Sequence, residues 1–319
     1  MARETRISAQ LQHLLTYAGT SMKRNHEIVL VTALLMGILL VSGCSMKKSG
    51  AYLPEQVATG QVMVGDVNIG YRDYGEGYPL VMMMGLSGTM DIWDPNFISI
   101  LSQSNRIIMF DYRGIGKSDS GSKPITIKQY AEDVSGLMAA LNIPKANVLG
   151  WSMGTYVAQE FVLAYPEKVN RVVLCAADFG GDKAIMPTQE VIHAMSKGSD
   201  SSGGVMATLF PSKWLENPEN QKYLQEVLGK SSGHPTHEAI RKQFEAWMSW
   251  EGTYDQLPQM KSTTLLITGS SDTSTPWQNT PLMFERLPHA WMIMIKDGGH
   301  GVMFQEPTLL ANMINGFLE

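Results

Sequence analysis

Two hydrophobic periodicities alternate along the chain from about residue 57 to its end. Short apolar runs predict β-strands, and the later runs are apolar on both faces, which is typical of a parallel sheet covered by helices on both sides. The predicted strands cover residues 56–64, 67–74, 79–84, 106–111, 147–150, 171–176, 263–268 and 291–296. Apolar side chains at steps of three and four predict amphipathic helices over residues 127–141 and 308–318. The pattern therefore predicts an α/β fold on a mostly parallel, eight-stranded sheet flanked by helices.

The strand pattern stops between residues 177 and 260. Helical stretches at residues 189–195, 220–228 and 237–250 are separated there by joints rich in Ser and Gly. Because the segment lies between two predicted core strands, we expect a helical insertion at about residues 180–260.

The N-terminal region has a different pattern. Residues 28–41 form an uninterrupted, mostly apolar run that follows two basic residues and ends at Gly43-Cys44. Such a run is too short to span a bilayer comfortably as a helix, but it fits the core of a signal peptide. The small residues before Cys44 resemble a bacterial lipobox, so we expect residues 1–43 to be a lipoprotein signal peptide and Cys44 to be lipidated. An uncleaved signal anchor, or an ordinary signal peptide cut nearby, is the alternative.

Three expectations follow from this N-terminal pattern. Met22 begins a signal peptide of ordinary proportions, and is therefore an alternative start of the chain. Residues 44–55 are mostly polar, which predicts a flexible tether in front of a folded domain at residues 56–319. Acyl chains such as palmitate on Cys44 would hold that domain at a membrane of the bacterial cell envelope, outside the cytoplasm. The sequence leaves open whether that membrane is the inner or the outer one.

Composition agrees with one large globular domain. The chain of 319 residues is 44% apolar and 17% charged, which suffices for a sizeable core. Its formal net charge is −5 and the sequence contains no cluster of basic residues, so no nucleic-acid partner is expected. Of its two cysteines, Cys175 lies in an apolar run and is expected to be a small buried hydrophobic residue. Nothing in the sequence indicates an oligomeric state.

The candidate chemistry begins with Gly150-Trp151-Ser152-Met153-Gly154, which stands between an apolar run and a helical pattern. A strand, a sharp turn and a helix form the setting of a nucleophile elbow, where the serine is strained and the glycines let neighbouring chains approach. Two later strands end near further reactive residues. The strand at 263–268 leads to Asp272, and the apolar run at 291–295 leads to His300.

This combination resembles the α/β-hydrolase superfamily, whose members carry nucleophile, acid and base in this chain order. The resemblance covers about residues 57–319 and includes the turn Asp111–Ser118, which is similar to the family's D-x-R-G-x-G-x-S turn. It implies an α/β-hydrolase fold in which the helical insertion caps the active site. It also implies a catalytic triad of Ser152, Asp272 and His300.

Two aspartates are candidates for the acid. Gly269, Asp272 and Pro276 match the family's G-x-x-D-x-x-x-P spacing, which favours Asp272. Asp178 directly follows the strand at 171–176, where some members of the family carry the acid instead. Asp272 is therefore the predicted acid, and Asp178 is the alternative.

Each expected site residue has a chemical task. Ser152 is a weak nucleophile at its own pKa, so His300 is expected to take its proton while Asp272 orients the imidazole. The developing oxyanion needs two N–H donors, of which the first is the backbone of Met153. The resemblance implies the second donor at Leu86, where this chain has Met84-Gly85 in place of the family's His-Gly pair.

The resemblance implies a serine hydrolase, similar to carboxylesterases and lipases. We expect it to cleave a carboxylic ester or lactone of a small to medium hydrophobic substrate through an acyl-enzyme. Carbon–carbon bond hydrolysis, thioester hydrolysis and cofactor-free perhydrolysis use the same triad and stay open. A non-catalytic, membrane-tethered binding protein is less favoured, because Ser152, Asp272 and His300 are all present. Haloalkane dehalogenases and epoxide hydrolases are excluded, since they carry Asp at the nucleophile position.

No cofactor and no metal are expected. No G-x-G-x-x-G sequence opens a predicted helix. His234 and His237 lie in a Gly/Pro/Ser joint without a neighbouring cluster of Cys or carboxylates, which is typical of solvent-exposed histidines.

Overall fold

The structure is a computed structural model that describes residues 58–196, 204–229 and 235–319. The predicted signal peptide at 1–43, the start at Met22, the lipidated Cys44 and the tether at 44–55 lie outside these residues. No helix in the described part of the chain is both long and apolar enough to cross a bilayer.

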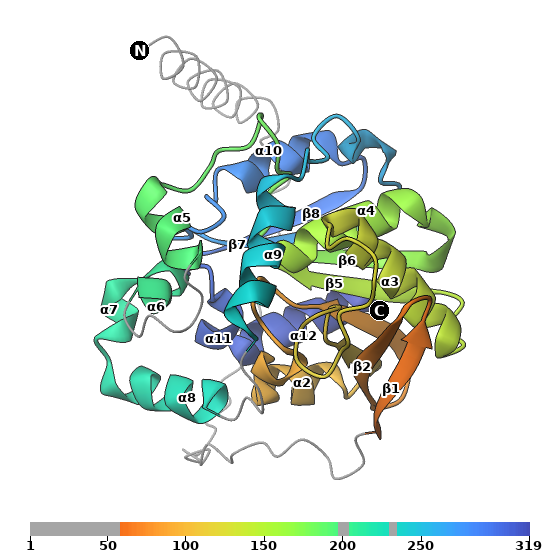
Figure 1. Cartoon of the computed structure of the whole chain (residues 1–319). Helices are drawn as coiled ribbons and strands as arrows, with labels where there is room; N and C mark the ends of the chain where they lie inside the picture. The colour runs from red at the N-terminus through yellow and green to blue at the C-terminus, as the bar shows by residue number, and fades with distance from the viewer. Residues whose placement is uncertain (1–57, 197–203, 230–234) are drawn as a thin grey trace, which may run out of the picture. The chain divides into compact units, whose positions relative to one another are not determined.

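One sheet of eight strands forms the centre of the described domain (Figure 1). Its strands are β1 (Ala58–Val64), β2 (Val67–Tyr74), β3 (Tyr78–Met83), β4 (Asn105–Phe110), β5 (Ala146–Trp151), β6 (Val169–Cys175), β7 (Thr263–Gly269) and β8 (Ala290–Ile295). They lie in the order β1-β2-β4-β3-β5-β6-β7-β8. The pairs β1–β2 and β2–β4 are antiparallel and the others are parallel, which confirms the predicted mostly parallel sheet.

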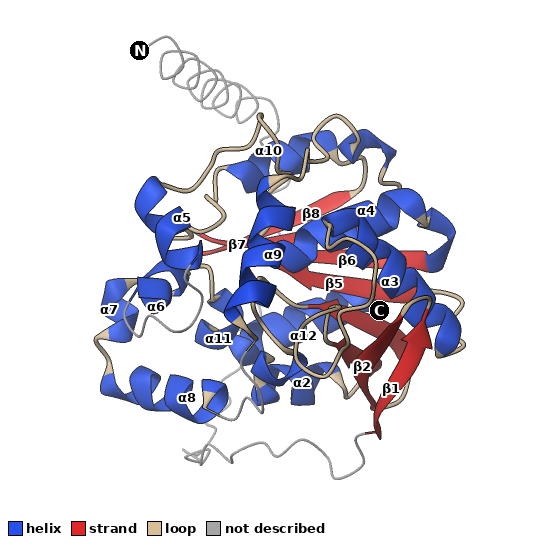
Figure 2. Cartoon of the chain, viewed as in Figure 1, coloured by secondary structure: helices blue, strands red, loops and turns tan. Residues whose placement is uncertain are grey.

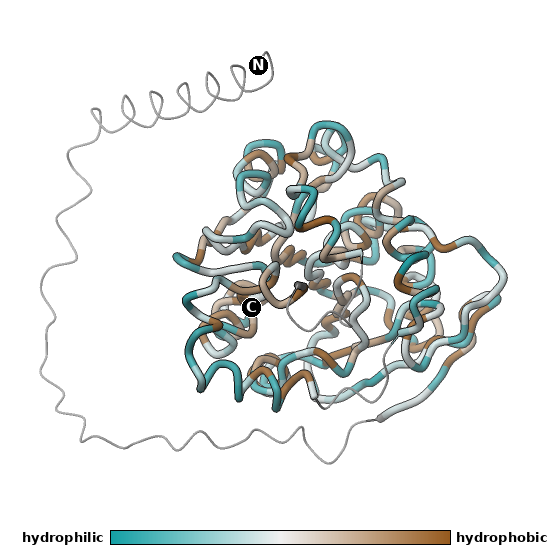
Figure 3. The backbone as a smooth tube through the Cα atoms, turned by 60° about the vertical axis from the view of Figure 1, so that its left-hand side comes forward, coloured by the Kyte–Doolittle hydropathy of each residue, from teal (hydrophilic) through white to brown (hydrophobic). Residues whose placement is uncertain are grey.

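The central strands are apolar on both faces because helices cover both. Every residue of β5 is buried, and Val148, Val172 and Leu266 have no exposed surface. One face carries α3 (Ile127–Ala140), α4 (Met153–Ala164) and α10 (Asn279–Arg286), and the other carries α2 (Pro95–Leu101) and α12 (Pro307–Leu318) (Figure 2). Hydrophobic segments accordingly run through the interior, while many outer turns are hydrophilic (Figure 3).

The first turns of these helices explain where they begin. The Thr126 hydroxyl accepts a hydrogen bond from the backbone N–H of Gln129, which caps α3. Pro307 opens α12, where its missing N–H leaves no hydrogen bond unmade. Sequence reasoning missed α2 and α10, which are too short to show a clear helical period.

A helical insertion joins β6 to β7. We call its described residues between 180 and 260 the cap. It contains α5 (Gln189–Ser196), α6 (Gly204–Leu209), α7 (Ser212–Leu215), α8 (Pro218–Leu228) and α9 (His237–Met248). Polar side chains tie the cap to the rest of the domain: the buried Trp250 indole N–H donates to Glu160 at 2.7 Å, and the half-buried Tyr223 hydroxyl donates to Asp94.

The turn after β4 is locked by buried charges. The Arg113 guanidinium has no exposed surface and donates two hydrogen bonds, of 2.6 and 2.7 Å, to the Asp133 carboxylate on α3. Asp111 accepts the backbone N–H groups of Met90 and Lys117. These contacts indicate a structural role for the turn Asp111–Ser118, because the Arg113 and Asp111 side chains both bond to neighbouring segments of the fold.

The outer edge of the sheet is apolar. β8 is a terminal strand, and its Trp291, Met292 and Met294 side chains are all exposed, Trp291 by 62%. The Trp291 ring makes an edge contact with Phe317 of α12.

Candidate active site

Ser152 occupies the turn between β5 and α4. Its backbone has φ 56° and ψ −126°, a conformation that costs free energy for a residue with a side chain. The surrounding sheet holds it there, because the Ser152 N–H donates to the carbonyl of Cys175 on the neighbouring strand β6 at 3.0 Å. The side chain is almost fully buried, and it projects from the carboxyl end of the central strand.

The two motif glycines are needed for close backbone packing. A β-carbon on Gly150 would collide with the carbonyl of Gly154, and one on Gly154 would collide with the carbonyl of Met83 on β3. Both collisions are with backbone atoms that cannot move aside without disturbing the sheet. The Gly-x-Ser-x-Gly pattern is therefore a packing requirement of this turn.

His300 reaches Ser152 from the loop that follows β8. Its Nε2 lies 2.7 Å from the Ser152 Oγ, within hydrogen-bond distance. The imidazole is 2% exposed, so water has little access to it. The backbone carbonyl of His300 accepts the indole N–H of Trp151 at 3.0 Å, which fixes the loop against the nucleophile turn.

Asp272 lies on the other side of the imidazole, in the loop after β7. Its carboxylate oxygens are 3.0 and 3.1 Å from His300 Nδ1. The same carboxylate accepts the backbone N–H groups of Ser274 and Thr275 and the Thr275 hydroxyl. With its lone pairs so occupied the carboxylate cannot rotate, and the imidazole is held in one orientation.

The alternative acid, Asp178, has other partners. It accepts the Tyr156 hydroxyl at 3.2 Å and the Gly180 N–H at 2.8 Å, and its side chain makes no hydrogen bond to His300. Burial raises the pKa of Asp178 to about 6, with its hydrogen bonds and the charge of His300 acting in the opposite direction. The structure thus brings Ser152, His300 and Asp272 together and leaves Asp178 beside them.

The two expected oxyanion donors lie beside the nucleophile. Met153 follows Ser152 at the first position of α4. The loop that carries Leu86 also passes close by, because a β-carbon on Gly85 would lie 3.1 Å from the Ser152 Cβ. Among the described residues, the backbone N–H groups of Met153 and Leu86 have no hydrogen-bond acceptor. Both are therefore free to bind a substrate oxygen.

The cap contributes contacts that sequence reasoning missed. The carbonyl of Leu209, at the end of α6, accepts the N–H of Gly301 at 2.8 Å, directly after His300. The carbonyl of Thr208 accepts the Ser274 hydroxyl at 2.8 Å, in the loop that holds Asp272. No sequence motif could have indicated these contacts, because their acceptors are backbone carbonyls, which every residue has.

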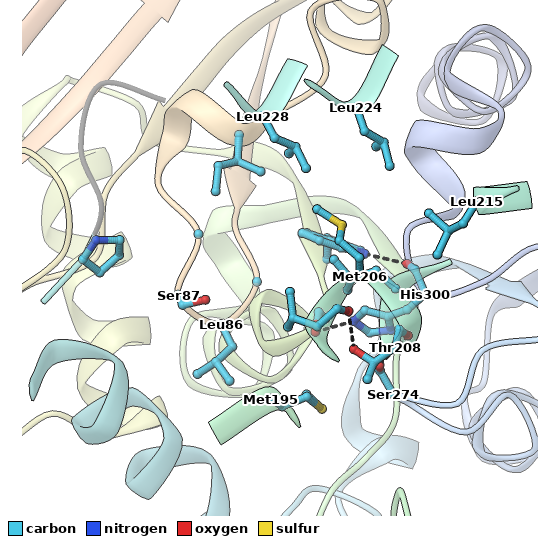
Figure 4. A pocket seen from close by; sticks show the side chains of 18 of the residues that line it. Leu86, Ser87, Met195, Met206, Thr208, Leu215, Leu224, Leu228, Ser274 and His300 are labelled. Atoms are coloured by element: carbon cyan, nitrogen blue, oxygen red, sulfur yellow. Dashed lines mark hydrogen bonds between the residues drawn. The ribbon is translucent and has the colours of Figure 1, made fainter. Parts of the chain in front are cut away.

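A cavity of about 760 Å³ opens above Ser152 and His300. Apolar side chains dominate its lining, among them Leu86, Met206, Leu215, Leu224 and Leu228, which Figure 4 labels, and Ile92. Most of these side chains belong to the cap, so the cap forms much of the cavity wall. None of the described lining residues is Asp, Glu, Lys or Arg.

Two further titratable candidates, Cys175 and His237, lie in the described part of the chain. Burial raises the pKa of the Cys175 thiol to about 12, so this cysteine stays protonated and unreactive. His237 is exposed at the start of α9, and His234 lies outside the described residues. The residues that the structure describes contain no group of three or more His, Cys, Asp or Glu arranged to hold a metal ion.

Comparison with known proteins assigns the fold to a family. A family profile described as the alpha/beta hydrolase fold matches residues 78–307. The chain is 25% identical over 257 residues to a putative carbamate hydrolase, RutD, of Azorhizobium caulinodans, covering 79% of this chain and 96% of that protein.

Solved structures show the same architecture. A thermophilic esterase from Thermogutta terrifontis superposes with a TM-score of 0.70 at 20% identity, covering 82% of this chain and 98% of that one. A meta-cleavage product hydrolase from Pseudomonas fluorescens superposes with a TM-score of 0.65 at 21% identity, covering 81% and 97%.

Proposed function

Because the chain belongs to the α/β-hydrolase superfamily of enzymes, we propose that it is a serine hydrolase that cleaves a carboxylic ester or lactone through an acyl-enzyme. Ser152 is the nucleophile, His300 the general base and Asp272 the acid that orients His300. The observation that carries this proposal is the continuous contact of Ser152 Oγ, His300 Nε2, His300 Nδ1 and the Asp272 carboxylate at the floor of an apolar cavity.

Acylation follows from this geometry. As the Ser152 Oγ attacks the ester carbonyl, its proton passes to His300 Nε2, and Asp272 stabilises the resulting imidazolium. The carbonyl oxygen becomes an oxyanion that accepts the N–H groups of Met153 and Leu86. When the tetrahedral intermediate collapses, the C–O bond of the leaving alcohol breaks and His300 returns the proton to its oxygen.

Deacylation repeats these steps with water as the nucleophile. His300 takes one proton from a water molecule, whose oxygen attacks the acyl carbon bound to Ser152. The Ser152 Oγ then leaves and recovers its proton from His300, so the products are a carboxylic acid and the free enzyme.

The cavity supports an uncharged, hydrophobic substrate. Its apolar lining stabilises a buried acyl chain or ring, whereas no Lys or Arg stands among the described lining residues to bind a substrate carboxylate or phosphate. A volume of about 760 Å³ suits a small to medium molecule. Thioester hydrolysis, carbon–carbon bond hydrolysis and perhydrolysis use the same residues, and substrates for the first two are assayed alongside the ester.

Hydrolysis of p-nitrophenyl esters by the purified full chain tests the proposal. Acyl chains from acetate to laurate would be compared for wild type and Ser152→Ala, with a thioester and a vinylogous diketone as further substrates. We expect ester hydrolysis that disappears in Ser152→Ala and a chain-length optimum set by the cavity. A folded wild type with no more ester hydrolysis than Ser152→Ala would contradict the proposal and favour the other chemistries or a binding role.

We further propose that lipid on Cys44 attaches the domain to a membrane of the bacterial cell envelope. Support comes from the apolar run at 28–41 and the lipobox-like sequence that ends at Cys44. Cys44→Ser should move the protein from the membrane fraction to the soluble fraction, or leave its precursor unprocessed, without changing ester hydrolysis. Unchanged partitioning and processing of this variant would contradict the proposal.

A further inference from the structure

A buried glutamine of the cap contacts the loop that carries Leu86. Gln243 lies on α9, and its side chain has no exposed surface. Its Oε1 accepts the backbone N–H of Ser87 at 2.8 Å, across 156 residues of sequence. A buried amide is less favourable than an apolar side chain of the same size unless it is hydrogen-bonded, so this contact gives Gln243 a role that leucine or methionine could not take.

The contacted residue has a strained backbone. Ser87 has φ 59°, in the left-handed region that non-glycine residues seldom adopt. A conformation of this kind persists only where the surroundings hold it. The hydrogen bond that the Ser87 N–H donates to Gln243 is such a restraint, because relaxation of the Ser87 backbone would turn this N–H away from the Oε1.

Two further hydrogen bonds near Leu86 are accepted by carbonyls of this loop. The Tyr112 hydroxyl donates to the carbonyl of Met84 at 3.1 Å, and the Gly88 N–H donates to the carbonyl of Gly85 at 3.2 Å. These bonds hold the Met84–Gly85, Gly85–Leu86 and Ser87–Gly88 peptides, and among the described residues neither of them reaches the Leu86–Ser87 peptide. Gln243 supplies the bond to that peptide.

We infer that Gln243 is a positioning residue that holds the Leu86 N–H toward the substrate's acyl oxygen by bonding to the next N–H, that of Ser87. Gln243 does not line the cavity, so it acts on the loop and not on the substrate directly. The cap would thereby take part in stabilising the oxyanion as well as in binding the substrate. This inference rests on the proposed function, in which Leu86 is an oxyanion donor.

Gln243→Met tests it, because methionine keeps the size of the side chain and removes the acceptor. We expect kcat for a p-nitrophenyl ester to fall about 10- to 100-fold, as for a displaced transition-state donor, with KM within about twofold. Hydrogen–deuterium exchange should become faster in the peptide covering residues 84–90. Gln243→Glu keeps an acceptor oxygen at this position and should retain slow exchange there, which covers the case of a poorly folded methionine variant.

Tyr223→Phe is the matched control. It also removes a hydrogen bond between the cap and the core, that to Asp94, and this bond involves no residue of the loop at 84–90. Its kcat and its exchange at 84–90 should match wild type. Equal losses of kcat in Tyr223→Phe and Gln243→Met would overturn the inference, because they would reflect a general loosening of the cap.

The remaining outcomes also decide the inference. Wild-type kcat and wild-type exchange in Gln243→Met would overturn it, as would faster exchange at 84–90 with no fall in kcat. If the wild type cleaves no ester, the proposed function fails on its own. The exchange measurement then still decides whether Gln243 holds the loop.

Discussion

The sheet and the cap hold the candidate site in different ways. On the sheet, Ser152 is restrained by the adjacent strand through the carbonyl of Cys175, and Asp272 by its neighbours in sequence, Ser274 and Thr275. The cap reaches the same site from far along the chain, through Leu209 to the loop of His300 and through Gln243 to Ser87. The sheet therefore supplies the reactive groups, and the cap supplies restraints on the loops that carry them.

The sharpest test of the sheet's part compares the two buried aspartates. Asp272→Asn should lower kcat/KM by about 10⁴-fold, because an amide in this place favours the wrong imidazole tautomer. Asp178→Asn should leave kcat/KM within about threefold, because the Asp178 carboxylate accepts the Tyr156 hydroxyl and the Gly180 N–H and makes no hydrogen bond to His300. The two variants are compared in steady-state ester hydrolysis, and a larger loss in Asp178→Asn would reverse the assignment.

The cap's restraint on the base is tested at Phe210. This ring is 2% exposed, stacks on Trp214 and packs against Gly301 and Phe304. Phe210→Ala should lower the free energy of unfolding by about 3–5 kcal/mol, because it leaves a cavity beside the His300 loop.

Urea denaturation measures this loss, and kcat per folded molecule measures the effect on the base. We expect kcat to fall as well, since the loop after His300 loses its packing. A destabilised variant with wild-type kcat would show that the sheet alone holds His300.

Asp178 should make the free energy of unfolding depend on pH, by an amount intermediate among these predictions. Its pKa in the folded chain is about 6, above the ordinary 3.8, so the folded state binds the proton more tightly than the unfolded state does. Stability is therefore lost as pH rises from about 4 to about 6. Asp178→Asn should remove this slope and unfold with a free energy about 2–3 kcal/mol higher than wild type at pH 7.5.

Chemical denaturation of wild type and Asp178→Asn across pH 4 to 8 measures this difference in the free energy of unfolding. The difference should vanish near pH 4, where both side chains are neutral. A stabilisation that is the same at all pH values would contradict the assigned cause.

The smallest expected effect comes from a single hydrogen bond between the cap and the loop that carries Asp272. Ser274→Ala removes the hydroxyl that donates to Thr208 in the cap while leaving the Ser274 N–H that donates to Asp272. The free energy of unfolding should fall by about 1 kcal/mol, measured by thermal denaturation. A loss of several kcal/mol would mean that the cap and the acid loop depend on each other more than one bond explains.

Most of the sheet could be predicted because each strand has its own local run of apolar residues in the sequence. The apolar runs placed all eight strands within about two residues of their observed ends. The motif around Ser152 and the strand ends before Asp272 and His300 are local signals of the same kind. The structure adds their distances, which no pattern along the chain contains.

The cap's contribution could not be predicted for a physical reason. Gln243 has an ordinary place in an amphipathic helix, and only folding brings it to Ser87. Leu209 contacts Gly301 through its backbone carbonyl, so the identity of its side chain does not indicate the contact. Short helices such as α7 also lack the length at which a period becomes visible.

The order of the strands has a consequence for when the chain becomes reactive during synthesis. Ser152 and its strand are complete early, but the acid and the base lie on loops after β7 and β8, which follow the whole cap. A nascent chain that has folded only its first six strands therefore carries a serine without the base that activates it. If the proposed function holds, hydrolytic competence is the last property the polypeptide acquires, and fragments that end before β8 are expected to be inert.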